Sequence, residues 1–284
     1  MKIKITKAHG TGNSFAIIYA NSNHSIITDP NFIKKVCGKK DGFNTDGMLL
    51  ISDHKHYDYQ LDYYNNDGTW ETFCANGSRS AALFMYAKKL CSNSIKFLAG
   101  DGEHTVAIKN SNHITLSMRP PFFKSQKTIS NGCSGYFIDS GAKHFATEVD
   151  TINKDTCYKL GSKIRFDKQF PDGTNVNFVQ VLSKKSISVC TYEKGIENIV
   201  LSCGSGSVAA AFYMDAIKKI TSPISIVSEG GTLLLSFDSS WSKVYLTGSA
   251  IILDSQEFYL LNNNTFLLLL ALVYFSILNF EYGF

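Results

Sequence analysis

Two segments of the chain resemble each other closely, and this repeat constrains the fold more than any other feature of the sequence. CANGSRSAALFMYA begins at Cys74 and CGSGSVAAAFYMDA begins at Cys203, a constant separation of 129 residues. Seven of the fourteen aligned positions are identical, among them both cysteines. Because 129 residues is close to half of the 284-residue chain, the repeat predicts two similar lobes, each with a Cys just before a helix.

The rest of the chain is dominated by short strand patterns. Several alternate apolar with polar residues, as half-buried antiparallel strands do. The expected strands are Ile3 to Ile5, Phe15 to Tyr19, Met48 to Ile51, Tyr57 to Tyr64, Thr105 to Lys109, His113 to Met118, Phe178 to Val181, Ile187 to Tyr192, Thr232 to Phe237 and Lys243 to Ile252. The repeated segments predict central helices over Ser78 to Leu90 and Ser207 to Lys219. Together these patterns predict an α+β fold.

Composition excludes several classes of protein. Hydrophobic residues make up 44% of the chain and charged residues 18%, which excludes intrinsic disorder as its default state. The net charge of +4 comes from scattered pairs of lysines, so we expect no nucleic-acid partner. The seven cysteines form no CxxC motif and no Cys/His pair with zinc spacing, so we expect neither a disulfide framework nor a structural metal. The N-terminal MKIKITKAHG lacks the apolar region of a secretory signal, which predicts a cytoplasmic protein with reduced thiols.

Two cysteines at facing helix N-termini have a specific chemical use. Unpaired N–H groups and the helix dipole lower a thiol's pKa there and also bind a carboxylate. If both sulfurs converge on one cleft, one thiolate can remove the proton from a carbon next to a carboxylate while the opposite thiol protonates the other face. The repeat therefore favours an enzyme that inverts such a carbon. The other five cysteines are expected to be small buried core residues.

Seven ordered motifs between about residues 3 and 260 resemble those of the diaminopimelate epimerase family, cofactor-independent two-thiol epimerases of lysine and peptidoglycan biosynthesis. They are KAHGTGNSF (7–15), GFNTDGMLLI (42–51), NNDGTWETFCANGSR (65–79), SGAKHF (140–145), FPDGTNVNFV (170–179), YEKGIENIVLSCGSG (192–206) and YLTGSA (245–250). The resemblance implies two pseudo-symmetric lobes, each a mostly antiparallel sheet or barrel around a central helix, with the active site in the cleft between them. We expect an N-terminal lobe over 1–120, a C-terminal lobe over 121–248, and a final strand over 249–260 that returns to the N-terminal lobe.

The resemblance also implies roles for individual residues. Cys74 and Cys203 match the paired acid and base, and no cofactor is expected. The amides around the reacting carboxylate would come from Ala75, Asn76, Gly77, Gly204, Ser205 and Gly206. Asn13, Asn65 and Asn175 match substrate-contacting asparagines, and Glu193 and His144 match polar residues that line the site, His144 as an auxiliary group. Lys194 is expected to hold the remote carboxylate of a small dicarboxylic amino-acid substrate.

Departures from the family pattern leave alternatives open. Ala75 replaces the usual Gly after the first Cys, Ala142 and Lys143 replace an Asn and a Pro, and Lys194 replaces an Arg whose planar fork binds a carboxylate in two places. Ala142 and Lys194 favour a racemase of another amino acid in the same superfamily. A binding paralogue without catalysis is a second alternative, although both cysteines are intact. A pyridoxal phosphate racemase is a third, but no lysine lies in a recognisable Schiff-base setting.

The segment 261–284 lies beyond the motifs and contains the apolar run FLLLLALVYFSILNF. Fifteen helical residues extend about 22 Å, short of the roughly 30 Å hydrocarbon core of a membrane. The run lacks a polar face and a strongly basic flank, which argues against an interfacial helix. We therefore expect a nonessential extension. Packing against the body or in a homodimer, and membrane association, are the alternatives.

Overall fold

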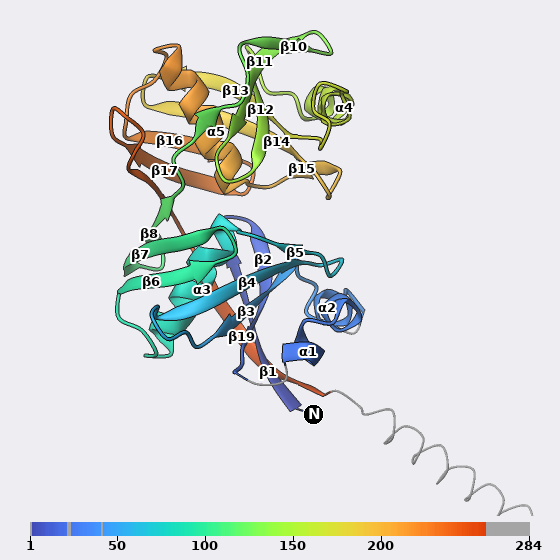
Figure 1. Ribbon diagram of the computed structural model, residues 1–284, viewed down its shortest axis with the longest axis vertical. Coiled ribbons are helices and arrows are strands. Elements are labelled where there is room, and N and C mark those ends of the chain that lie inside the picture. Colours follow the sequence, from blue (N-terminus) through green and yellow to red (C-terminus); the bar gives the residue numbers. More distant parts are fainter. Residues whose placement is uncertain (1, 22–23, 41, 260–284) are drawn as a thin grey trace, which may run out of the picture.

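Two lobes lie end to end along the long axis of the computed structural model (Figure 1), which describes residues 2–21, 24–40 and 42–259. The first lobe contains β1 (Lys2–Gly10), β2 (Asn13–Tyr19), α1 (His24–Ile27), α2 (Pro30–Cys37), β3 (Gly47–Ser52), β4 (Tyr59–Asn65), β5 (Trp70–Glu71), α3 (Ala75–Ala87), β6 (Ser94–Ala99), β7 (Gly102–Asn110), β8 (His113–Met118) and the last strand, β19 (Ile251–Tyr259). The second contains β9 (Phe122–Phe123), β10 (Thr128–Ser130), β11 (Cys133–Asp139), β12 (Lys143–Glu148), α4 (Lys154–Arg165), β13 (Asn175–Ser183), β14 (Ser186–Glu193), β15 (Asn198–Val200), α5 (Gly204–Ala216), β16 (Ile224–Ser228), β17 (Gly231–Phe237) and β18 (Val244–Gly248). The expected α+β fold is confirmed.

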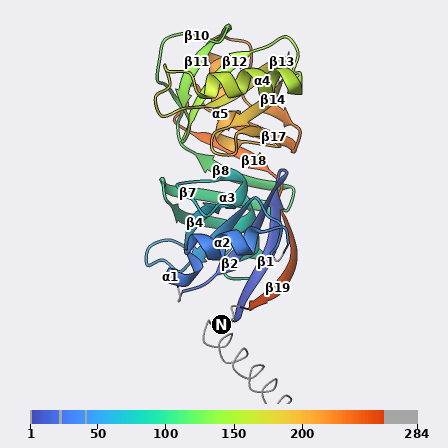
Figure 2. The ribbon, with the colours of Figure 1, turned by 90° about the vertical axis from the view of Figure 1, so that its right-hand side faces the viewer.

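The strands of the two lobes pair in the same order. In the first lobe β1–β2 is antiparallel, β2–β3 parallel, β3–β4 antiparallel, β4–β6 parallel, and β6–β7 and β7–β8 antiparallel. In the second lobe β11–β12, β12–β13, β13–β14, β14–β16, β16–β17 and β17–β18 repeat that alternation. The crossovers of the first parallel pairs carry α2 and α4, which lie on the same side of the molecule (Figure 2). The sequence repeat is therefore the most similar part of a repeat of whole lobes.

The central helices α3 and α5 are buried over most of their length. Each has thirteen residues and begins three residues earlier than expected, directly after its Cys. The shift arises because the Cys side chain itself caps the helix, so the glycines that follow lie inside the first turn. Both helices also end early, since Lys89 and Lys218, again 129 residues apart, adopt positive φ angles of 58° and 60°.

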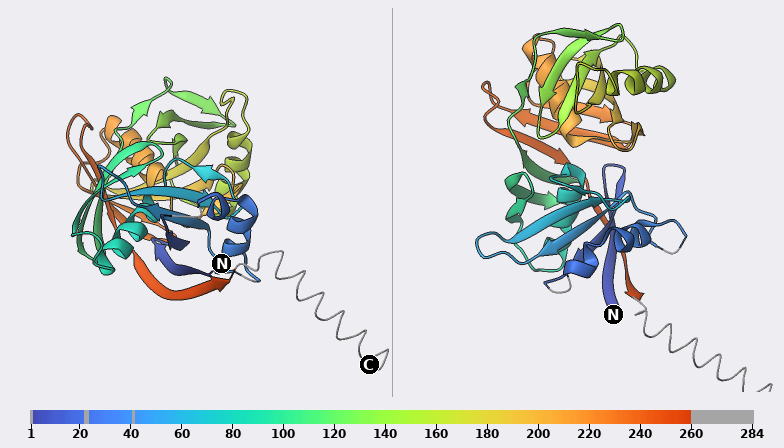
Figure 3. Two further views of the ribbon diagram at one scale, coloured as in Figure 1. Left: turned by 60° about the horizontal axis from the view of Figure 1, so that its bottom comes forward. Right: turned by 45° about the vertical axis from the view of Figure 1, so that its right-hand side comes forward.

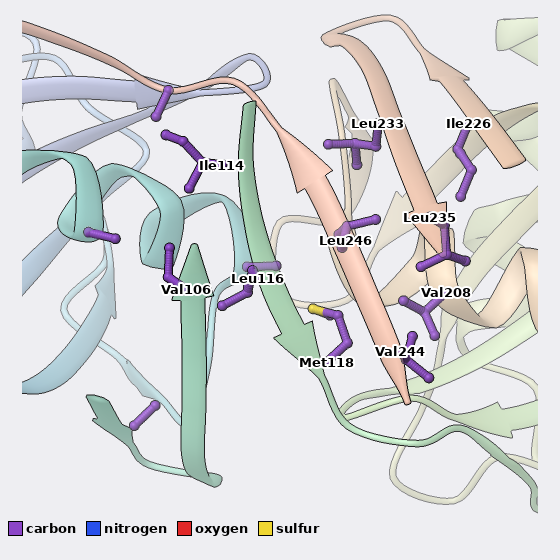
Figure 4. Packing of buried hydrophobic residues seen from close by; sticks show 14 of the residues in the cluster. Val106, Ile114, Leu116, Met118, Val208, Ile226, Leu233, Leu235, Val244 and Leu246 are labelled. Atoms are coloured by element: carbon purple, nitrogen blue, oxygen red, sulfur yellow. The ribbon is translucent and has the colours of Figure 1, made fainter. Parts of the chain in front are cut away.

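The lobes are joined by β8 and β18, which pair antiparallel across the waist of the molecule. Leu116 pairs with Leu246 and Met118 with Val244, and their side chains belong to one buried cluster that continues from α3 to α5 (Figure 4). After β18 the chain crosses to the first lobe, where β19 runs beside β1 (Figure 3). The single strand expected over Lys243 to Ile252 is therefore wrong: it is two strands, interrupted at Ser249 and Ala250.

No helix within the described residues is long and apolar enough to span a membrane. The apolar extension 261–284 lies outside those residues.

Candidate active site

A cavity of about 370 Å³ lies where the lobes face each other, and residues of both lobes line it. The first lobe contributes Asn13, Tyr63, Asn65, Glu71, Thr72, Phe73, Cys74, Ala75 and Asn76. The second contributes Gly141, Ala142, Lys143, Asn175, Glu193, Lys194, Gly195, Ile196, Val200, Ser202, Cys203, Gly204 and Ser205. The structure thus brings eleven of the fourteen expected site residues to one cavity wall; Gly77, Gly206 and His144 are not part of that wall.

Both candidate catalytic cysteines are helix N-caps with nearly the same backbone conformation. The φ and ψ angles are −139° and 110° at Cys74, and −132° and 116° at Cys203. Each Sγ accepts a hydrogen bond from the third amide of its helix, Gly77 N or Gly206 N, at 3.4 Å. These two amides therefore contact the sulfurs. An N–H donor at a helix end stabilises a thiolate.

The first residues of the two helices touch. A Cβ placed on Gly204 would lie 2.5 Å from the Cβ of Ala75, far closer than two carbons can approach. Gly204 therefore has to lack a side chain so that Ala75 can pack against its backbone. The departure at residue 75 is accommodated in this way, and the two helix N-termini, with their positive dipole ends, converge on the same cavity.

The two thiols have neighbours of opposite charge. Burial raises the pKa of Cys74 to about 11, while the Gly77 amide and the positive charge of Arg79 act to lower it. Burial also raises the pKa of Cys203, and there the carboxylate of Glu193 raises it further. Glu193 also raises the pKa of Cys74, but Arg79 acts in the opposite direction there, so Cys74 is the more acidic thiol of the pair.

Arg79 is a residue that the sequence reasoning missed. It is fully buried, and its Nη2 donates to Asn76 Oδ1 at 2.5 Å and to Thr11 Oγ1 at 3.0 Å. Burial lowers its pKa to about 10, so the guanidinium stays charged at neutral pH, and no carboxylate among the described residues pairs with it. The repeat offered no signal because Val208 stands at the matching position of the second helix.

Arg79 sets the orientation of two asparagines in the cavity wall. Because the guanidinium donates to Asn76 Oδ1, the Nδ2 group of Asn76 donates in turn to Asn13 Oδ1, at 2.5 Å. Because the Oδ1 atom of Asn13 accepts this hydrogen bond, the Nδ2 group of Asn13 remains as a donor. Both amides line the cavity, so this arrangement suits an anionic ligand group.

His144 lies behind the second thiol. It is fully buried, and burial lowers its pKa to about 4, so the ring is neutral at physiological pH. Asn177 Nδ2 donates to Thr191 Oγ1, which leaves its Oδ1 to accept from His144 Nδ1 at 2.7 Å. His144 Nε2 then accepts from Ser205 Oγ at 3.0 Å, and Ser205 Oγ lies 3.6 Å from Cys203 Sγ. His144 therefore positions Ser205 instead of lining the cavity, contrary to expectation.

Glu193 and Lys194 follow one another at the end of β14. The Glu193 carboxyl contacts the Cys203 thiol, burial raises its pKa to about 7, and its Oε2 has no hydrogen-bond partner among the described residues. Asn175 Oδ1 accepts from the backbone N–H of Lys194 at 2.8 Å, which fixes this turn. Lys194 Nζ donates to the carbonyl oxygen of Asp172 at 2.8 Å.

The remaining expected residues have local partners. Asn65 Oδ1 accepts from the hydroxyl of Tyr63 at 2.8 Å, and Asn65 Nδ2 donates to Thr69 Oγ1 at 3.1 Å. Lys143, one of the departures from the family pattern, pairs with the carboxylate of Asp172. The cavity therefore combines two thiols, four asparagines and charges of both signs, which suits a small zwitterionic ligand.

Comparison with known proteins assigns the chain to a family. The diaminopimelate epimerase family model matches residues 5–123 and 136–253. The chain belongs to the diaminopimelate epimerase family. The diaminopimelate epimerase of Aquifex aeolicus is 34% identical to it over 261 residues, covering 86% of this chain and 93% of that protein. The enzyme of Flavobacterium psychrophilum is 32% identical over 255 residues, covering 87% and 97%.

The fold is also similar to that of more distant proteins. A phenazine biosynthesis protein of the PhzF family from Bacillus anthracis has a TM-score of 0.73 at 12% sequence identity, covering 92% of this chain and all of that one. At this identity the likeness shows the two-lobed α+β fold alone. The resemblance inferred from the seven motifs is confirmed by the family match.

Proposed function

We propose that this chain is a diaminopimelate epimerase, an isomerase of lysine biosynthesis that interconverts L,L- and meso-diaminopimelate. The observation that carries the proposal is the meeting of two thiols, each capping a helix of a different lobe, at one cavity wall. Such a pair reaches an α-carbon from opposite sides, which inversion of the carbon requires. The names of the relatives support the substrate.

The mechanism uses groups of this chain at each step. The thiolate of one Cys takes the α-proton, and the thiol of the other Cys donates its proton to the opposite face. The amides at the two helix N-termini, together with Asn76 and the Nδ2 of Asn13, stabilise the negative charge that spreads onto the carboxylate. After turnover the protonation states of the two sulfurs are exchanged, so the reverse reaction starts from the other thiol.

The charged neighbours define the resting state. Arg79 favours the thiolate at Cys74, whereas Glu193 favours the protonated form of Cys203. We therefore assign the base of the resting enzyme to Cys74 and the acid to Cys203. Both thiols must stay reduced for this chemistry, so we expect the enzyme to work in the cytoplasm.

The proposal is tested with purified enzyme and L,L-diaminopimelate in deuterated water. We expect formation of the meso isomer with deuterium at the inverted α-carbon, measured by NMR. Replacing Cys74 or Cys203 with Ala should reduce epimerisation by about 10³-fold or more, because each face of the carbon needs its own proton carrier. Slow exchange without inversion can persist through the remaining thiol. Epimerisation by Cys203→Ala at the wild-type rate would show that the two-thiol mechanism is wrong.

A racemase of another amino acid is the second candidate function. Ala142 presents no polar group where the family often has Asn, and the Lys194 ammonium cannot bind a carboxylate with the two-pronged geometry of Arg. The same exchange experiment with single-centre amino acids separates the two functions. Faster exchange of such an amino acid than of diaminopimelate would favour this second function.

A further inference from the structure

The segment that leads into the first thiol packs on a histidine behind the cavity wall. Phe73 lines the cavity and directly precedes Cys74, so its placement affects the position of the thiol. The ring of Phe73 stacks on the imidazole of His104, with centroids 4.2 Å apart and ring planes 13° apart. His104 lies on β7, is 2% exposed and is not part of the cavity wall. The proton transfers between the two thiols do not involve it.

The stack of rings continues from His104 into the core of the first lobe. The imidazole centroid lies 5.5 Å from that of Phe97, and the ring of Phe97 lies 5.2 Å from that of Tyr59. Phe97 and Tyr59 are fully buried. Stacked rings of this kind stabilise one another beyond the apolar area that they bury. His104 therefore connects Phe73, at the cavity, to rings that are fixed in the core.

Hydrogen bonds at both ring nitrogens fix the orientation of His104. Nδ1 donates to the carbonyl oxygen of Ser117 at 3.0 Å, and Nε2 lies 2.9 Å from Asp101 Oδ1. The Asp101 side chain is buried, and its Oδ2 has no hydrogen-bond partner among the described residues, so His104 is the group that satisfies this carboxyl. The imidazole cannot rotate without losing both hydrogen bonds, and Phe73 therefore packs on a fixed surface.

The turn that joins β6 to β7 supports the same segment. A Cβ placed on Gly100 in this turn would lie 2.6 Å from Cζ2 of Trp70 and 2.9 Å from the Cα of Thr72. The turn therefore packs directly against the backbone that leads to Cys74, which only a Gly allows. Together with His104, this hairpin holds the segment before the thiol at two places.

We propose that His104, oriented by Asp101, is a positioning residue for the first thiol: it holds Phe73 and thereby places Cys74 Sγ against the α-carbon of the substrate. This inference deepens the proposed function and rests on it. A displacement of about 1 Å in a reacting group can reduce a rate by about 10²-fold. Because His104 acts through Phe73 and does not touch the substrate, it affects proton transfer more than substrate binding.

The test is a double-mutant cycle between His104→Gln and Phe73→Leu, assayed by exchange of the α-proton of diaminopimelate in deuterated water. His104→Gln keeps a donor for Asp101 but removes the ring that stacks on Phe73. It should lower kcat about tenfold and leave KM within about twofold of the wild-type value. Because both substitutions remove the same stack, adding His104→Gln to Phe73→Leu should lower kcat by no more than about twofold.

Alkylation of the two thiols by iodoacetamide, quantified by mass spectrometry, gives a second readout. His104→Gln should raise the alkylation rate of Cys74 about fivefold, because the segment before it opens more easily, while Cys203 in the other lobe keeps its wild-type rate. The matched control is His113→Gln, which removes an exposed imidazole at the start of β8 and should change neither kcat nor either alkylation rate. If His104→Gln does not fold, Asp101→Asn takes its place, since it keeps the ring and weakens its anchor.

Wild-type kcat in the folded variant, or losses that multiply in the double variant, would overturn the positioning role. A rise in alkylation that is equal at both thiols would overturn it as well, because it would indicate a general loss of stability. A wild-type enzyme that exchanges no α-proton of diaminopimelate would overturn the proposed function. The alkylation rates would then still show whether His104 places the first thiol.

Discussion

Two buried titratable residues next to the second thiol have pKa values shifted in opposite directions. Burial raises the pKa of Glu193 to about 7 and lowers the pKa of His144 to about 4. The folded state therefore holds a proton on Glu193 that the unfolded chain releases above about pH 4.5, and it excludes from His144 a proton that the unfolded chain binds below about pH 6.5. Between pH 4.5 and 6.5 the Glu193 contribution to stability falls as pH rises, the His144 contribution rises, and the two largely cancel.

Glu193→Gln should expose this cancellation. The variant loses the group whose contribution falls between about pH 4.5 and 7, so relative to wild type its free energy of unfolding should increase over that window, by about 3 kcal/mol at most. Urea unfolding at pH 4.5 and 7.5 measures the difference. Glu103→Gln, which removes an exposed carboxylate, should show no such increase. A Glu193→Gln variant whose stability relative to wild type is the same at both pH values would contradict the raised pKa.

At the residue scale, sequence could name the groups that lie within recognisable motifs. It found both cysteines and the asparagines of the cavity wall. It missed Arg79, whose role depends on burial and on its hydrogen bonds to Thr11 and Asn76. It assigned His144 to the cavity because a motif does not report which way a side chain points. Contacts between residues 61 to 68 positions apart are set by the packing of lobes and loops, which local sequence does not encode.

At the element scale, the sequence predicted the existence and type of the two central helices but not their ends. The expected helices began only after the glycines that follow each Cys, whereas the thiol caps the helix and brings those glycines into its first turn. The helices α2 and α4 were not predicted at all. Both are short crossovers whose apolar face is completed only by the sheet on which they pack.

The capping role of the thiols predicts that stability and activity separate at these positions. Cys203→Ser and Cys203→Ala should both lose epimerisation, because neither provides a thiol. Cys203→Ser keeps a side-chain acceptor for the Gly206 amide, so it should be more stable than Cys203→Ala by about 1 kcal/mol. Thermal unfolding of the two variants measures this difference. Equal stability would show that the side chain at residue 203 contributes nothing as a helix cap.

At the scale of the whole molecule, the repeat at 129-residue spacing predicted two lobes, and the matching order of strand pairing explains why so short a similarity was sufficient. The residue pattern alone did not indicate the crossing between lobes after β18, which was expected only because the family resemblance implied a final strand over 249–260 that returns to the N-terminal lobe. The apolar pattern continues across Ser249 and Ala250, and a strand pattern does not say which lobe supplies the partner strand. Such pairing is decided by long-range packing.

The fit of the two lobes depends on the contact between Ala75 of α3 and Gly204 of α5. Gly204→Ala would place a methyl group 2.5 Å from that of Ala75, so the helix N-termini have to separate. Overpacking of this kind destabilises by about 1–3 kcal/mol, and a displacement of about 1 Å between the thiols should reduce kcat by about 10²-fold. The double variant Ala75→Gly with Gly204→Ala moves the methyl group to the other helix and should recover most of both losses. Thermal unfolding and exchange of diaminopimelate measure the two effects. If the double variant is no better than Gly204→Ala alone, the Ala75 contact does not set the spacing of the lobes, and the defect must come from the other neighbour of the new methyl group, Leu246, whose Cδ2 lies 3.3 Å away.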